Sequence, residues 1–161
     1  MRHTLTIALV ALALGGCFGQ PGSRDEDALG DVDHDPAGPE HRPGQPCLVC
    51  HGADYTPGGD VFSLAGTVFE TPSSTLGLSG VSVLITDASG RVWTERSNRA
   101  GNFYIEGERE LAYPLHVALE LDGERIEMRS PIMREGSCAH CHTKDGPGAA
   151  SVGRVYLRET P

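Results

Sequence analysis

The chain contains one five-residue pattern twice, Cys-x-x-Cys-His, at residues 47–51 and 138–142. Four of its five cysteines belong to these two patterns, and the fifth is Cys17. Side chains three positions apart lie on the same side of a helical turn, and an imidazole follows the second thiol directly. Each pattern therefore favours a local turn that presents two thiols and one imidazole together.

This spacing is typical of the covalent attachment of c-type haem. The two thiols add to the two vinyl groups of the haem, and the histidine supplies an axial nitrogen to the iron. The sequence therefore predicts two haems c. Their covalent and axial bonds would come from Cys47, Cys50 and His51 in the first motif and from Cys138, Cys141 and His142 in the second.

Two other interpretations of the four cysteines stay open. If the motifs converge in space, four thiolates could hold one tetrahedral Zn²⁺ or Fe ion. In an oxidising compartment, the same cysteines could form two structural disulfides. Neither alternative requires a histidine after each cysteine pair.

The second axial ligands are less constrained by the sequence. His41, six residues before Cys47, is one candidate. His116 falls on the polar face of its expected strand, and His140 lies inside its own motif, where it could reach only the neighbouring haem. Met133 could supply a thioether, a ligand that raises the potential.

The first sixteen residues predict a signal peptide. Arg2 precedes a short apolar run at 5–14, which is too short to span a membrane. The run ends in Leu14-Gly15-Gly16-Cys17, which resembles the bacterial lipobox. That resemblance implies lipidation of Cys17 and a lipid-anchored protein of the bacterial cell envelope. The residue that follows, Phe18, implies the outer membrane, facing the periplasm or the exterior; the alternative is an ordinary signal peptide with an incidental cysteine.

Residues 17–46 are acidic, rich in Gly and Pro and poor in large apolar side chains, which predicts a flexible, disordered tether. The formal net charge of the whole chain is −9, and no basic patch interrupts it. Nucleic acid is therefore not an expected partner. The 21 glycines and 11 prolines favour turns and strands over long helices.

The remainder of the chain predicts a mainly β fold with little helix. Short runs of alternating apolar residues, separated by turn residues such as Asp122-Gly123, predict seven strands at 66–70, 81–86, 91–96, 102–106, 113–121, 124–129 and 153–158. We expect a small seven-stranded antiparallel β-sandwich over residues 65–161, preceded by a first haem-attachment segment at 47–64.

Part of this sandwich resembles a known family. The segments Gly66-Thr67-Val68-Phe69, Leu78-Ser79-Gly80-Val81-Ser82-Val83, Thr86-Asp87-Ala88-Ser89-Gly90 and Ser97-Asn98-Arg99-Ala100-Gly101-Asn102-Phe103-Tyr104 follow one another in order. Over roughly residues 65–130, the sequence is similar to the carboxypeptidase-regulatory-like, or prealbumin-like, β-sandwich. The resemblance implies a fold and a non-catalytic interaction module, and it brings no active-site residues to this chain.

Strand parity predicts that the two motifs meet. If seven strands alternate in direction, the first and the last are parallel, and the segments before them lie at one pole of the sandwich. We therefore expect an exported electron carrier or redox docking module with a redox partner protein and a lipid bilayer as its partners, and not an enzyme. A peroxidase-like activity would need one iron with an open site. The alternative function is a non-redox binding module with a structural four-cysteine metal site.

Overall fold

The computed structural model describes residues 29, 37–53, 59–143, 147–148 and 151–158. The predicted signal peptide, Cys17 and most of the predicted tether lie outside these residues. Within the described residues, no helix has the length and apolar character needed to cross a membrane.

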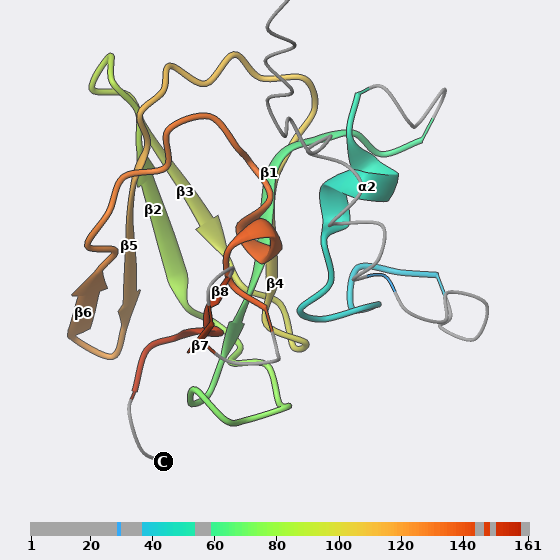
Figure 1. Ribbon diagram of the computed structural model, residues 1–161, viewed down its shortest axis with the longest axis vertical. Helices are drawn as coiled ribbons and strands as arrows, with labels where there is room; N and C mark the ends of the chain where they lie inside the picture. Colours follow the sequence, from blue (N-terminus) through green and yellow to red (C-terminus); the bar gives the residue numbers. More distant parts are fainter. Residues whose placement is uncertain (1–28, 30–36, 54–58, 144–146, 149–150, 159–161) are drawn as a thin grey trace, which may run out of the picture.

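The fold is mainly β, as predicted. One sheet has the order β4-β1-β9 and the other the order β3-β2-β5-β6, while β7 and β8 form a separate short pair (Figure 1). The strands are β1 (Phe62–Phe69), β2 (Ser82–Thr86), β3 (Val92–Arg96), β4 (Asn102–Glu106), β5 (His116–Leu121), β6 (Glu124–Glu127), β7 (Pro147–Gly148), β8 (Ser151–Val152) and β9 (Val155–Tyr156). Two short turns carry the Cys-x-x-Cys-His motifs, namely α2 (Cys47–His51) and the 3-10 turn η1 (Cys138–His140).

The core lies between the two larger sheets and follows from the alternation of apolar residues. Strand β2 buries Val83 and Ile85, while Ser82, Leu84 and Thr86 on its other face are only partly buried. Facing side chains come from β1 and β4 of the other sheet, and neighbouring ones come from β5. The buried cluster consists of Leu64, Val68, Val81, Val83, Ile85, Phe103, Ile105, Leu115, Leu119 and Leu157.

All seven predicted strands are present, with β5, β6 and β9 shorter than predicted, and two further differences concern the start of β1 and the pairing of β9. Strand β1 begins at Phe62, four residues before the predicted start, because it pairs with β4 from Phe62 to Thr67. Strand β9 pairs with β1 in parallel, with Val68 opposite Val155, so the sandwich is not wholly antiparallel. Two parallel neighbouring strands cannot be joined by a tight hairpin and need a longer crossover connection. Here the chain passes through the second motif, after β6, before it reaches β9 beside β1.

A third layer covers the outer face of the β4-β1-β9 sheet. Residues 38–46 pack there, where the Gly44 amide donates to Thr67 Oγ1 at 2.8 Å. The turn α2 follows this segment and lies on the side of β1 away from the four-stranded sheet (Figure 1). The last part of the expected tether is thus held against the sandwich.

Candidate cofactor site

The first motif forms a single helical turn after Pro46. The Val49 amide donates to the Pro46 carbonyl at 3.1 Å, and the Gly52 amide donates to the Leu48 carbonyl at 2.9 Å. Positions three apart on such a turn share a face, so Cys47 and Cys50 lie on one side of α2. The turn is short because Gly52 is extended and leaves the helix.

The His51 ring is oriented by a backbone group and by an aromatic stack. Its Nδ1 lies 2.7 Å from the Asp60 carbonyl oxygen. A carbonyl oxygen only accepts, so Nδ1 carries the proton and the neutral ring has its lone pair on Nε2. The ring stacks on Phe62 at a centroid distance of 4.5 Å, and Phe62 stacks on Tyr104 at 4.3 Å. Metal-bound histidines commonly have this arrangement, with the second nitrogen bonded to a carbonyl.

His41 lies next to His51, and its ring is held in the same way. Its Nδ1 bonds to the Gly38 carbonyl oxygen. The centroids of the two imidazole rings are 5.8 Å apart, and the ring planes are inclined at 53°. The structure thus brings together one candidate ligand of the first motif and one candidate from the segment before it.

A cavity of about 470 Å³ lies beside the first motif. This volume is within the range of small-molecule and cofactor sites. Its walls come from α2, the 37–46 segment and the outer face of β1 and β4, and they include His41, Cys47, Cys50, His51, Asp60, Phe62, Asn102, Tyr104 and Glu106.

The second motif is also a backbone turn whose histidine is bonded to a carbonyl, but other parts of the chain supply these partners. The His142 amide donates to the Cys138 carbonyl at 2.9 Å, closing the turn. The His142 Nδ1 lies 2.8 Å from the Gly153 carbonyl oxygen, which again places the lone pair of the neutral ring on Nε2. Burial lowers the pKa of His142, against the opposing effect of the bond to Gly153. The neutral imidazole, the form that binds a metal, is therefore favoured.

The two motifs flank strand β1. Ser137 forms a parallel bridge with Ala65, and the Ala65 amide donates to the Gly136 carbonyl at 3.0 Å. On the same side, Leu48 Cδ1 lies 3.1 Å from where a Cβ of Gly136 would stand. The motifs converge, as strand parity predicts. They meet alongside β1 and not at the pole of the sandwich beyond its end. The strand β9 is short and leaves part of the β1 edge unpaired, and residues 136–138 occupy that part of the edge.

The thiols that face the sandwich are hard to ionise. Burial raises the pKa of Cys47 to about 11, and the charge of Cys50 adds to the effect. Burial raises the pKa of Cys138 to about 12, with contributions from the charges of Cys47 and Cys141. The electrostatic interaction between Cys47 and Cys138 is further evidence that the motifs adjoin.

None of the four motif cysteines is joined in a disulfide. Among the described residues, no three side chains of His, Cys, Asp or Glu are grouped so that they could hold a metal ion. The thiols of the two motifs therefore adjoin without forming a tetrahedral ligand set in this conformation.

The other candidate ligands are placed differently from His41. His116 is exposed at the start of β5, opposite Thr86, on the outer face of the four-stranded sheet. The core separates it from α2. Met133 is 65% exposed in the segment before the second motif. His140 is half-buried within η1, and its amide donates to the Ser137 carbonyl at 3.1 Å.

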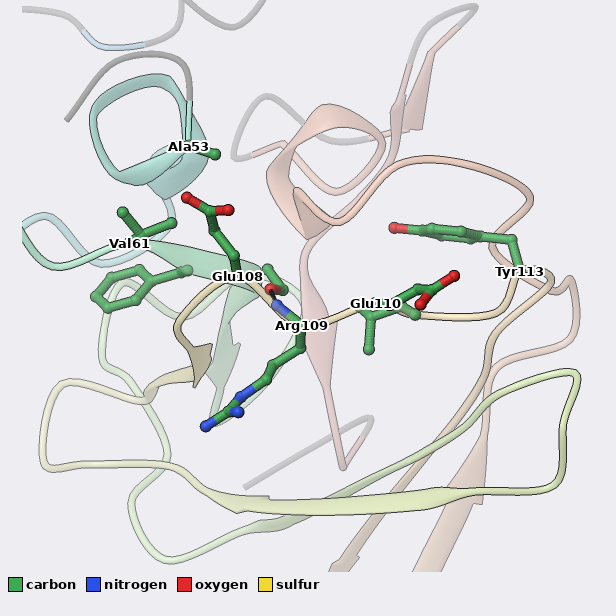
Figure 2. Close-up of a pocket in the computed structure, with 9 residues that line it drawn as sticks. Ala53, Val61, Glu108, Arg109, Glu110 and Tyr113 are labelled. Carbon is green, nitrogen blue, oxygen red and sulfur yellow. Dashed lines mark hydrogen bonds between the residues drawn. The ribbon is translucent and has the colours of Figure 1, made fainter. Parts of the chain in front are cut away.

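A second cavity, of about 430 Å³, lies between the chain after α2 and the 108–113 segment. Figure 2 shows Glu108 extending toward Ala53, with the Arg109 guanidinium turned to the other side. Burial raises the pKa of Tyr113, which lines this cavity, and the charges of Glu135 and Cys138 add to the rise. Its lining reaches Ala53, two residues after the first motif.

Sequence reasoning missed the groups that orient the histidines. The carbonyls of Gly38, Asp60 and Gly153 carry no side-chain signal, and their role depends on how the backbone folds around each ring. Asn102 was expected only as the first residue of a strand and as part of the family-like pattern. In the structure its side chain also binds the 39–41 backbone.

No protein-family model, curated protein or solved structure matches this chain. The prealbumin-like resemblance therefore stays a prediction from sequence. The functional proposal depends on the residues and geometry of the chain itself.

Proposed function

We propose that this protein is a dihaem c-type cytochrome that carries electrons in the bacterial cell envelope, held to a membrane through a lipidated Cys17. Cys47 and Cys50 would bind one haem covalently, and Cys138 and Cys141 the other. His51 and His142 would be the axial ligands. The main observation in support is that both histidines are oriented in the same way, each bonded through Nδ1 to a backbone carbonyl.

The residues around the first motif fit a haem. Cys47 and Cys50 share a face of α2, and the adjacent cavity of about 470 Å³ is lined by the rings of Phe62 and Tyr104. Aromatic side chains exclude water from the faces of a planar ligand. When bound, haem supplies an iron centre that accepts and releases one electron.

The chain's own residues would set the conditions for that exchange. The carbonyls of Asp60 and Gly153 fix the ring orientation of His51 and His142 and increase the basicity of the free nitrogen. The sandwich provides a stiff support, since both motifs pack against β1. A rigid support keeps the cofactor surroundings similar in both oxidation states, which suits a carrier better than an enzyme.

One observation favours the alternative function, a binding module with a structural four-cysteine site for Zn²⁺ or Fe. The two motifs adjoin alongside β1, and the charge of Cys47 contributes to the raised pKa of Cys138. Such a site would leave both motif histidines without a role. We therefore place the haem proposal first.

The deciding experiment is expression of the full chain in a bacterium with c-type haem attachment machinery. We expect the intact mass to increase by two haems, and the reduced-minus-oxidised spectrum to show a c-type α band. The double variant C47S/C50S should keep one haem, and C138S/C141S should keep the other. A protein without covalent haem but with one zinc or iron per chain by elemental analysis would contradict the cytochrome and support the alternative.

A further inference from the structure

His41 and His51 lie at a separation that suits two imidazoles bound to one metal ion. Two imidazoles on one ion, each with a metal–nitrogen distance of roughly 2 Å, have ring centroids about 6 Å apart. The observed centroid distance is 5.8 Å. Both rings use Nδ1 for a backbone carbonyl, so both neutral rings carry the lone pair on Nε2.

The surroundings of the pair match those of the first motif. His41 and His51 line the same cavity as Cys47 and Cys50. Phe62 covers the face of the His51 ring, at an interplanar angle of 20°. A ligand attached to the two cysteines would therefore lie next to both imidazoles.

We propose that His41 is the second axial ligand of the first haem, so that this centre has two histidine ligands and no open position. This inference rests on the proposed function. It assigns the role of electron carrier specifically to the first motif. An iron whose six positions are filled, four by the porphyrin nitrogens and two by histidines, does not bind small exogenous molecules. Any ligand-binding chemistry would then belong to the second centre.

His41 is held in place by a network that starts on the sheet. Asn102 is buried, and its side-chain amide donates to the His41 carbonyl at 2.9 Å and to the Pro39 carbonyl at 3.3 Å. The Asn98 amide also donates to the Pro39 carbonyl, at 2.5 Å. Thr67 completes the network, since its hydroxyl donates to Asn102 Oδ1 at 2.7 Å.

This network makes Asn102 a positioning residue for His41. Its amide group joins β4 to the segment that carries the imidazole, and the segment turns sharply around Arg42 and Gly44, both at positive φ. Without the amide, the His41 carbonyl loses this donor and the Pro39 carbonyl keeps only Asn98, which weakens the docking of the segment on the sheet. The position of His41 then depends mainly on its own bond to iron.

The other candidate ligands do not share these features. His116 lies beyond the core on the outer face of the far sheet, and Met133 is largely exposed. His116 therefore provides a matched control, as a histidine that can be replaced without touching the cavity.

The test compares the holoprotein with H41A and H116A. All three should carry two covalent haems by intact mass. We expect H41A to convert one of the two haems from low-spin to high-spin in the ferric electron paramagnetic resonance spectrum, and to bind one more equivalent of carbon monoxide when reduced. Added imidazole should reverse both changes, and H116A should behave as the wild type.

Two further variants complete the test. H41M keeps a ligand at the position but replaces nitrogen with a thioether, so one of the two midpoint potentials should rise. N102A should bind carbon monoxide at one haem that excludes it in the wild type, while its ferric spectrum stays largely low-spin. If H41A fails to accumulate, the H41M potential decides, and unchanged potentials contradict the proposal.

The possible failures can be told apart. A wild-type protein with no covalent haem refutes the proposed function as a whole. Two haems in H41A with an unchanged spin state and no additional carbon monoxide binding refute only the role of His41.

Discussion

A Cβ atom on Gly66 would stand 2.8 Å from Sγ of Cys138, a distance that such atoms do not adopt without movement. Gly66 is in the middle of β1, and Cys138 begins the second motif. The glycine thus makes room for the cysteine against the sandwich, and it links the packing of the core to the geometry of the motif.

We expect G66A to affect haem attachment at the second motif and not at the first. The added methyl group would push against Cys138 and Phe103, at a cost of about 1–3 kcal/mol of unfolding free energy. Haem attachment at the second motif should fall, while attachment at the first continues, as measured by intact mass and peptide mapping. G90A is a suitable control, because Gly90 has φ +84° but open space around it. It should lose about 1 kcal/mol from backbone strain alone and keep both haems.

The motif thiols should react at very different rates in the apoprotein. A pKa of about 11 for Cys47 lowers its thiolate fraction by about 100-fold at pH 8 relative to an unperturbed thiol with a pKa of 9.0, and Cys138 should be slower still. Cys141 is exposed. We expect iodoacetamide to label Cys141 first and Cys138 last, as followed by peptide mass spectrometry. Labelling in urea should remove the difference, and equal rates in the folded apoprotein would contradict the burial of Cys138.

The same thiols give a prediction for alkaline stability. Their folded-state pKa values are raised above 9.0, so the folded state holds its protons more tightly than the unfolded state. The contribution of the thiols to stability is complete below pH 9 and is lost as the pH rises toward 11–12. Urea unfolding of the apoprotein between pH 8 and pH 10 should show this decline, and C138A should reduce its slope.

The contribution of His142 to stability depends on pH in the opposite direction, and in the acid range. Burial lowers its pKa below the usual 6.5, so the unfolded state takes up the proton more readily than the folded state. Its contribution is present above pH 6.5 and is lost as the pH falls through the folded-state pKa. The apoprotein should therefore lose unfolding free energy between pH 7 and pH 5, and H142Q should lose less over the same interval. H116Q, at an exposed histidine, should retain the full dependence.

The lipid anchor can be tested independently of the haems. The variant C17S removes the thiol that the lipobox resemblance predicts to be acylated. It should move the protein from the membrane fraction to the soluble fraction and abolish incorporation of labelled palmitate, with no change in haem content. Membrane association that persists in C17S would point to another means of attachment.

The sequence by itself determined the kind of fold and the local form of the first motif. The spacing of Cys47, Cys50 and His51 predicts a turn that joins two thiols to an imidazole, and α2 has that form. The alternation in 81–86 and 113–121 predicts strands, because a period of two buries one face of a sheet. Both signals are local, so no knowledge of distant contacts is needed to read them.

The tertiary structure alone decided which groups meet. His41 was one of several candidate ligands, and its place beside His51 depends on Asn102 and Thr67, which are far from it in sequence. The parallel pairing of β9 with β1 and the fit of Cys138 against Gly66 likewise arise from long-range packing. Local patterns determine what each segment can form, but the free energy of burying these segments together determines their neighbours.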